Sequence, residues 1–373
     1  MPGRMAQWGN DLYTGKRSYD IVGSRRRWFG LAIGLVAASL LLLLTIGLNL
    51  GIAFRGGSEF TVPGASTTAE QPAIDAVARI EGAQPPRVSV VGERTIRVQT
   101  SQLDDQQTDE LAGLLADAYG VGEAEIGSSF IGATWGADVT SKALRGLVIF
   151  LALVSLVLTL YFRDWRMALA GIVALLHDVA ITVGVYAVVG WEVTPATVIG
   201  FLTILGYSLY DTVVVFDKVR ENVAGVLDQR RYTYGEMANL AVNQTLVRSL
   251  NTSVVAVLPV ASILFIGAFL LGAGTLRDIA LALFIGIVAG TFSSVFIATP
   301  LLVWLREREP AVREHNAAVL AARAKSAAAA GGEPETVATA ARVRVGSLTP
   351  GEHLGNRAQP RRRNPNRPAG RKS

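Results

Sequence analysis

The sequence contains no cysteine and little charge. Because none of its 373 residues is a cysteine, disulfide bonds, thiolate metal sites and cysteine nucleophiles are excluded. Charged residues make up 17% of the chain, well below the roughly 25% of soluble domains. Hydrophobic residues make up 50%. This balance is typical of a membrane protein.

Signals of enzymatic chemistry are also missing. Residues 272–277 are glycine-rich but lack the Lys-Ser/Thr pair of a phosphate-binding loop. The sequence has no Ser-His-Asp or paired-carboxylate arrangement that supports hydrolysis. Its three histidines and scattered carboxylates lack the spacing of metal ligands. We therefore predict that the protein is not an enzyme, holds no metal or cofactor, and draws no energy from ATP bound to this chain.

Six segments are long and apolar enough to cross a bilayer core of roughly 30 Å, which needs about 20 helical residues. These predicted spans cover residues 29–50, 143–162, 167–189, 195–217, 250–272 and 277–304. The first follows three arginines, as a signal peptide does, but its apolar run is too long for a cleaved one. We interpret it as an uncleaved anchor.

Basic residues near the span ends predict the orientation of the protein. They cluster before span one, between spans two and three, between spans four and five, and after span six. The side that carries these loops is therefore predicted to be cytoplasmic, together with both termini. The predicted organisation is an N-terminal segment 1–28, span 29–50, an extracytoplasmic domain 51–142, spans two to six within 143–306, and a cytoplasmic tail 307–373.

The extracytoplasmic loop is long enough to be a small domain. Its residues 51–140 carry five arginines against thirteen acidic residues, a net charge of −8. Strands are predicted at 59–62, 87–91, 95–100 and 125–131, and helices at 71–80 and 104–118, with Asp104 as a helix cap. The order β-α-β-β-α-β predicts a ferredoxin-like α+β sandwich.

The tail differs in composition from the rest of the chain. Ala317–Ala330 is predicted to begin as a helix, and the remainder is rich in Gly, Pro and Arg without apolar periodicity, which is typical of disorder. Its arginines fit contact with ribosomal RNA or anionic lipid, or else a solvated tail on the positive side of the membrane. Because the positive net charge resides in this tail, we predict no specific nucleic-acid partner.

The most informative residue is Asp211, in the middle of the fourth span. A carboxylate at membrane depth costs a few kcal/mol or more and usually marks an ion or proton pathway. The alternative is a structural hydrogen bond between helices. If spans four and five pack antiparallel, Asp211 and Arg248 meet, and a carboxylate beside a movable arginine is a workable proton switch. Further polar residues are His177 and Asp178 in span three, Tyr210 in span four, and Asn251 and Thr252 in span five.

Two other patterns accompany these residues. Asp217, Arg220 and Glu221 are predicted to form a cytoplasmic charge cluster that anchors the end of span four. Gly286 and Gly290 form a small-xxx-small pattern in span six, which favours a helix packed closely against a partner rather than facing lipid.

Six motifs, in order and within residues 19–306, together resemble the SecF family. They are GIAFRGGSEF (51–60), IGATWGADVT (131–140), LLHDV (175–179), GYSLYDTVVVFDKVREN (206–222), NQTLVRSLNTS (243–253) and LFIGIVAGTFSSVFIATPLL (283–302). The motif glycines include Gly56, Gly57, Gly206, Gly286 and Gly290.

The resemblance implies half of a twelve-helix unit of the RND superfamily in the bacterial plasma membrane. It implies a SecD-like six-span partner, further partners in SecYEG, YidC and YajC, contacts with membrane lipids, and an unfolded preprotein as substrate. Export would use the proton-motive force, with Asp211 as the coupling carboxylate and Arg248 as its partner. Many relatives carry Asn where this chain has Tyr210, which bears on the details of coupling.

Two other functions fit the sequence. One is a half-size RND-type secondary exporter of lipids or small molecules, which also needs intramembrane carboxylates. The other is a passive assembly factor, whose polar membrane residues only hold helices together.

Overall fold

The structure, a computed structural model, describes residues 4–92, 94–268 and 274–329. The chain divides into two compact units. One comprises Ser24–Val214 and Arg248–Leu302; the other comprises Met1–Gly23, Val215–Val247 and Val303–Ser373. Each unit is described by itself.

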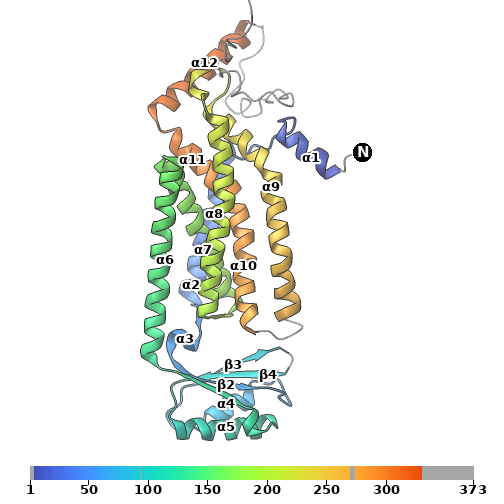
Figure 1. The fold of residues 1–373 in the computed structure, drawn as a ribbon, viewed down its shortest axis with the longest axis vertical. Helices are drawn as coiled ribbons and strands as arrows, with labels where there is room; N and C mark the ends of the chain where they lie inside the picture. Colours follow the sequence, from blue (N-terminus) through green and yellow to red (C-terminus); the bar gives the residue numbers. More distant parts are fainter. Residues whose placement is uncertain (1–3, 93, 269–273, 330–373) are drawn as a thin grey trace, which may run out of the picture. The chain divides into compact units, whose positions relative to one another are not determined.

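Among the described residues, six helical segments are long and apolar enough to cross a membrane. They are Arg25–Thr45, Thr134–Phe162, Trp165–Val189, Pro195–Asp228, Tyr234–Gly267 and Asp278–Arg306. The corresponding helices in Figure 1 are α2 (Arg25–Thr45), α6 (Ala133–Phe162), α7 (Trp165–Val189), α8 (Pro195–Val223), α9 (Tyr234–Ser262), α10 (Gly274–Ser293) and α11 (Thr299–Arg306). Two π-helical segments, η3 (Ile263–Ala268) and η4 (Ser294–Ala298), follow α9 and α10.

Helix α2 ends at Thr45, earlier than the predicted span. The chain leaves the helix because Asn49 and Leu50 form strand β1 (Asn49–Leu50), which pairs in parallel with β6 (Glu192–Val193) from the turn between α7 and α8. A short helix α3 (Ile52–Arg55) follows.

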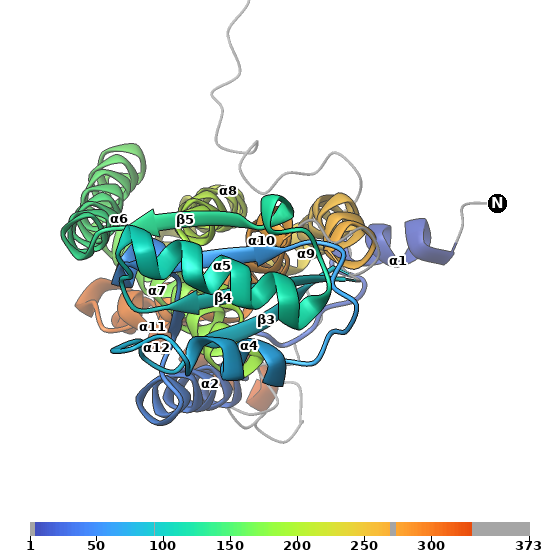
Figure 2. The ribbon, with the colours of Figure 1, turned by 90° about the horizontal axis from the view of Figure 1, so that it is seen from below.

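The region after α3 is an α+β domain, as the sequence predicts. Its elements are β2 (Gly57–Val62), α4 (Gln71–Val77), β3 (Arg87–Val91), β4 (Thr95–Thr100), α5 (Asp105–Tyr119) and β5 (Gly127–Ile131). The sheet is antiparallel with the order β3-β4-β2-β5, and α4 and α5 cover one of its faces (Figure 2). Asp104 caps α5 as predicted, in a reciprocal capping box with Gln107. Glu93, in the predicted hairpin turn, lies outside the described residues.

The core of this domain lies between the sheet and its two helices. Phe60, Val98, Leu111 and Leu115 are fully buried there. Alternate residues of each strand and one face of α5 supply this core, which is the pattern that the sequence periodicity predicts.

Glu192 connects the domain to the membrane helices within the same unit. Its carboxylate accepts hydrogen bonds from Arg97 Nη1 at 3.2 Å and from Gln99 Nε2 at 2.9 Å, both on β4. Asn49 Nδ2 donates to the carbonyl of Gly190 at 2.9 Å. These bonds, of which the two to the Glu192 carboxylate are charge-assisted, hold the domain against the α7–α8 turn.

The glycines of α10 allow a close approach to α8. A Cβ at Gly286 would lie 2.1 Å from Ile204 Cγ1, and a Cβ at Gly290 would lie 2.9 Å from Ser208 Cβ. The small-residue pattern of span six therefore faces another helix of this chain. Helix α7 packs against α2, α6 and α10.

The described part of the second unit brings residues 4–23 and 303–329 together with residues 215–247 of α8, α9 and the turn between them. Asn239 and Asn243 of α9 bind the backbone of the N-terminal segment: Asn239 Oδ1 accepts from Ile21 at 2.9 Å, and Asn243 Oδ1 accepts from Tyr19 at 2.7 Å. Helix α12 (Pro310–Ala329) contains the predicted helical part of the tail and is held by Arg323, which donates to Glu236 at 2.7 Å. The predicted disorder falls on residues outside the described part of the chain.

Candidate functional site

Asp178 and Asp211 are buried among the membrane helices of the larger unit, as is Asp278 of α10, which is 1% exposed. Asp178 on α7 is 0% exposed and Asp211 on α8 is 5% exposed. A buried carboxylate needs hydrogen-bond donors to offset the loss of water. For Asp178 and Asp211, two serine hydroxyls from other helices supply them.

Asp211 is held by serines from two neighbouring elements. Ser249 Oγ on α9 donates to Oδ1 at 2.7 Å, and Ser294 Oγ in η4 donates to Oδ2 at 2.5 Å. All three side chains are buried. This arrangement places one proton-binding group at a junction of α8, α9 and η4.

Asp178 has three polar partners. Ser208 Oγ on α8 donates to Oδ2 at 2.5 Å and Ser293 Oγ on α10 donates to the same atom at 2.8 Å. His177 Nδ1 lies 3.2 Å from Oδ1. The other ring nitrogen of His177 is buried and has no hydrogen-bond partner among the described residues.

The two carboxylates share the helices that supply their donors. Ser208 precedes Asp211 by three residues, so both lie on one face of α8. Ser293 and Ser294 are consecutive, at the point where α10 becomes the π-helix η4. Such π-helical turns occur frequently at functional sites. The junction between α10 and η4 therefore presents one serine to each carboxylate.

Arg248 does not form an ion pair with Asp211 in the described part of the structure. Its Nη2 lies 3.3 Å from the hydroxyl of Tyr210, which is 54% exposed. Because Arg248 precedes Ser249 and Tyr210 precedes Asp211, the exposed pair and the buried pair lie side by side on the same two helices. The two predicted partners are thus close in the fold but have different hydrogen-bond partners.

Other predicted site residues lie away from the carboxylates. Asn251 is exposed, and Thr252 donates to the carbonyl of Arg248 at 2.8 Å, within its own helix. In the second unit Lys218 pairs with Glu221 at 3.0 Å, while Arg220 is exposed and Asp217 is half-buried. Lys218 and Glu221 thus form one close ion pair within the segment predicted as a charge cluster.

The motif glycines have different structural roles. Gly56 and Gly57 have φ values of 78° and 133°, which side chains rarely adopt. Gly286 and Gly290 face α8, as described above. Gly206 has open space where a Cβ would stand, and nothing in the structure explains why it is glycine.

Sequence reasoning missed the serines that complete the site. None of Ser208, Ser249, Ser293 and Ser294 was predicted as a site residue, although all four lie within the motifs of the family. One signal was available: Ser208 lies one helical turn before Asp211 and therefore on the same face. The pairing of Ser293 with Asp178 depends on which helices meet, which the sequence alone does not state.

No group of three or more His, Asp or Glu side chains with metal-site geometry occurs in the described ranges. The arrangement of two hydroxyl-bound carboxylates can instead bind and release protons, or hold helices together.

Comparisons with known proteins identify relatives over most of the chain. The family "Protein export membrane protein SecD/SecF, C-terminal" matches residues 115–308. Protein translocase subunit SecF of Streptomyces coelicolor is 46% identical over 325 residues, covering 87% of each chain. The SecF subunit of Mycobacterium tuberculosis (strain CDC 1551 / Oshkosh) is 45% identical over 332 residues, covering 86% of this chain and 74% of that protein.

A solved structure supports the fold as well. The crystal structure of SecDF from Thermus thermophilus, described as a translocon-associated membrane protein, matches with a TM-score of 0.69 and 30% identity. The match covers 79% of this chain and 39% of that one. The predicted fold class is confirmed: six membrane-span helices, half of an RND-type unit, with a ferredoxin-like domain after the first.

Proposed function

Because the chain belongs to the SecF family of protein translocase subunits, we propose that it promotes protein export by coupling proton movement at Asp211 to a change in helix packing. Its relatives are translocase subunits, which supports an accessory role in Sec protein export for this multi-pass membrane protein. The observation that carries the proton-coupling part is the burial of Asp211 between two hydroxyl donors.

The chemistry follows from the charge of Asp211. Ionised, the side chain accepts both serine hydroxyls, as the distances of 2.7 and 2.5 Å allow. Protonated, it needs no countercharge and becomes a donor itself. Proton binding therefore changes the hydrogen bonds by which Asp211 joins α8 to α9 and η4.

Arg248 supplies the second half of the switch. Its guanidinium is held by Tyr210 at 3.3 Å, next to the residue that bears the buried carboxylate. An ionised Asp211 attracts this cation strongly where water is scarce, and a protonated one does not. In the proposed cycle, Arg248 moves from Tyr210 toward Asp211 when the proton leaves and returns when the next proton binds.

The partners follow from the family and remain proposals for this chain. The solved SecDF relative is more than twice as long as the matched part, which supports a separate SecD-like subunit as the other half here. We propose that the pair assists SecYEG, with YidC and YajC as further partners, and acts on unfolded preproteins. We propose that the α+β domain lies outside the cytoplasm and that both termini lie inside it. The reason is that basic residues cluster in the loops and terminal segments on the side of the membrane away from this domain, and such loops are usually cytoplasmic.

Export from membrane vesicles tests this function. Vesicles with wild-type protein or with Asp211→Asn are supplied with a reporter precursor, with and without a proton gradient. We expect the gradient to stimulate export only in the wild type, because an amide binds no proton in this range. The matched control is Asp138→Asn, which removes an exposed carboxylate on α6. Equal stimulation of wild type and Asp211→Asn would disprove the coupling role. Equal export from vesicles with and without the protein would disprove the export role.

A further inference from the structure

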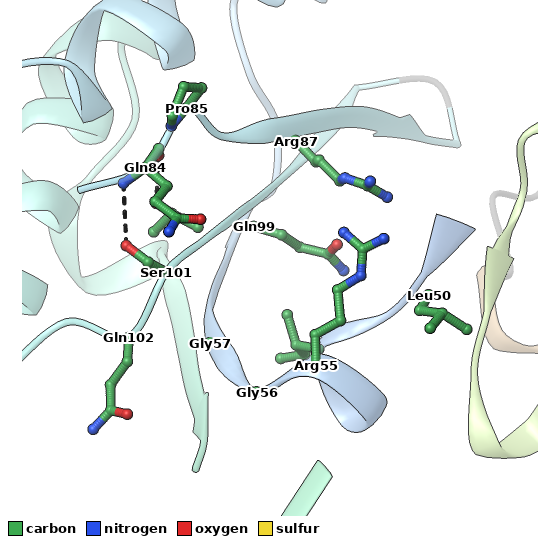
Figure 3. A pocket seen from close by; sticks show the side chains of 12 residues that line it. Leu50, Arg55, Gly56, Gly57, Gln84, Pro85, Arg87, Gln99, Ser101 and Gln102 are labelled. Atoms are coloured by element: carbon green, nitrogen blue, oxygen red, sulfur yellow. Dashed lines mark hydrogen bonds between the residues drawn. The ribbon is translucent and has the colours of Figure 1, made fainter. Parts of the chain in front are cut away.

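A cavity lies where the first membrane helix joins the α+β domain. Its volume is about 320 Å³. One wall is formed by β1, α3 and the glycines after it, and the other by β3, β4 and the adjoining loops (Figure 3). Helix α2 ends only a few residues before β1. The cavity is therefore near the end of a membrane span, at the level expected of lipid headgroups.

Two arginines of this cavity face each other. Figure 3 shows the guanidinium groups of Arg55 and Arg87 pointing toward one another, with Gln99 beside them. Arg87 donates to Asn49 Oδ1. Arg55 makes no side-chain hydrogen bond or ion pair within the described residues. Partial burial, and then the charge of Arg87, lower the pKa of Arg55.

The cavity has no negative charge to balance these arginines. No Asp or Glu is among its described lining residues, although residues 51–140 contain thirteen acidic residues and only five arginines. The two carboxylates that contact the lining residue Gln99 are also bound to Arg97. Glu59 accepts from Gln99 at 2.8 Å and lies 3.7 Å from Arg97, and Glu192 accepts from Arg97 and Gln99. Two like charges in one cavity of an acidic domain indicate a site for an anion.

The local backbone is built to hold the arginines there. A Cβ at Gly57 would lie 2.4 Å from the carbonyl oxygen of Thr100. Gly57 therefore lets the chain turn directly from α3 into β2 against β4, which places Arg55 next to Gln99. Leu50 and Ile52 add an apolar edge on the membrane side.

We propose that this cavity binds the phosphate of an anionic phospholipid headgroup. Guanidinium groups match phosphate oxygens in bidentate geometry, and this cavity lies near the end of a membrane span. The apolar edge accommodates the start of the acyl chains. The site is separate from Asp211 and does not depend on proton coupling.

Binding of short-chain phosphatidylglycerol to the full-length protein in detergent tests the proposal. Phosphatidylcholine and inorganic phosphate form separate arms. We expect phosphatidylglycerol to bind at least about tenfold more tightly than either, and Arg55→Gln and Arg87→Gln each to weaken it about tenfold. Arg79→Gln, which removes an exposed charge of the same domain, should leave binding unchanged. Thermal unfolding of each variant shows whether it is folded.

Several results would overturn the proposal. Equal binding of phosphatidylglycerol and phosphatidylcholine would overturn it, as would inorganic phosphate binding as tightly as phosphatidylglycerol. So would a loss of lipid affinity in Arg79→Gln equal to that in the other two variants, or an unfolded acidic peptide that binds more tightly than phosphatidylglycerol. If the glutamine variants do not fold, Arg87→Lys replaces them. Lysine keeps the positive charge but lacks the planar guanidinium that binds phosphate through two hydrogen bonds. This variant should weaken lipid binding measurably, but less than tenfold.

Discussion

Asp178 and Asp211 are similar buried carboxylates in neighbouring helices, yet their surroundings differ. Each accepts two serine hydroxyls, but Asp178 also contacts His177 and is fully buried. Among the described residues, Asp211 accepts hydrogen bonds only from the two serines. The residues next to the Asp211–Ser249 pair on α8 and α9 are an exposed tyrosine, Tyr210, and an arginine, Arg248. A carboxylate with all its partners fixed stabilises the fold, whereas one beside a weakly held cation can change its charge. This difference supports our proposal that Asp211 is the coupling residue, and we propose a structural role for Asp178.

The largest expected loss of stability comes from removing the carboxylate of Asp178. Asp178→Ala leaves two serine hydroxyls and an imidazole without their acceptor in an apolar interior, which should cost about 3 kcal/mol or more. Thermal unfolding in detergent measures this loss. Asp211→Ala leaves only two hydroxyls without their acceptor and should therefore lose less stability. A larger loss for Asp211→Ala would reverse our assignment.

A smaller loss is expected where α10 approaches α8. Gly286→Ala places a methyl group against Ile204, and overpacking of this kind costs about 1–3 kcal/mol. Gly206→Ala is the matched control, because nothing lies within 4 Å of a Cβ there, and it should be neutral or slightly stabilising. Equal unfolding temperatures for the two variants would contradict the close packing that aligns Ser208 with Ser293.

The consecutive serines sharpen the comparison. Ser294→Ala removes one of two donors to Asp211 and should lower gradient-driven export about threefold to tenfold, with little change in unfolding temperature. Ser293→Ala removes a donor to Asp178 and should cost about 1 kcal/mol of stability while export still responds to the gradient. Both variants are compared in the same vesicle and unfolding assays. Identical behaviour in both assays would remove the distinction between the two carboxylates.

The smallest effect is expected at Tyr210. Tyr210→Phe removes the hydroxyl that holds Arg248 at 3.3 Å, and an exposed change of this kind stays within about 0.5 kcal/mol of stability. We expect a change in the pH dependence of gradient-driven export, since the arginine loses its resting partner. An unchanged pH profile would show that Tyr210 does not hold the arginine in a functional state.

The sequence predicted the elements of this protein better than their contacts. Strand alternation and the Asp104 cap located the α+β domain, because local patterns determine those features. The six spans followed from apolar length, but α2 ended early since Asn49 and Leu50 pair with β6, a partner far away in the sequence. The carboxylates were visible as charged residues in apolar runs. Their serine donors were not, because a serine in a helix has no charge and its role depends on which helices meet.

Infrared difference spectroscopy of the purified protein during a pH change tests the central claim most directly. Protonation of a buried carboxylate produces a carboxylic C=O band. We predict such a band in the wild type and in Asp178→Asn, and its loss in Asp211→Asn. If the band persists in Asp211→Asn or disappears in Asp178→Asn, the proton binds elsewhere and Asp211 is not the coupling residue.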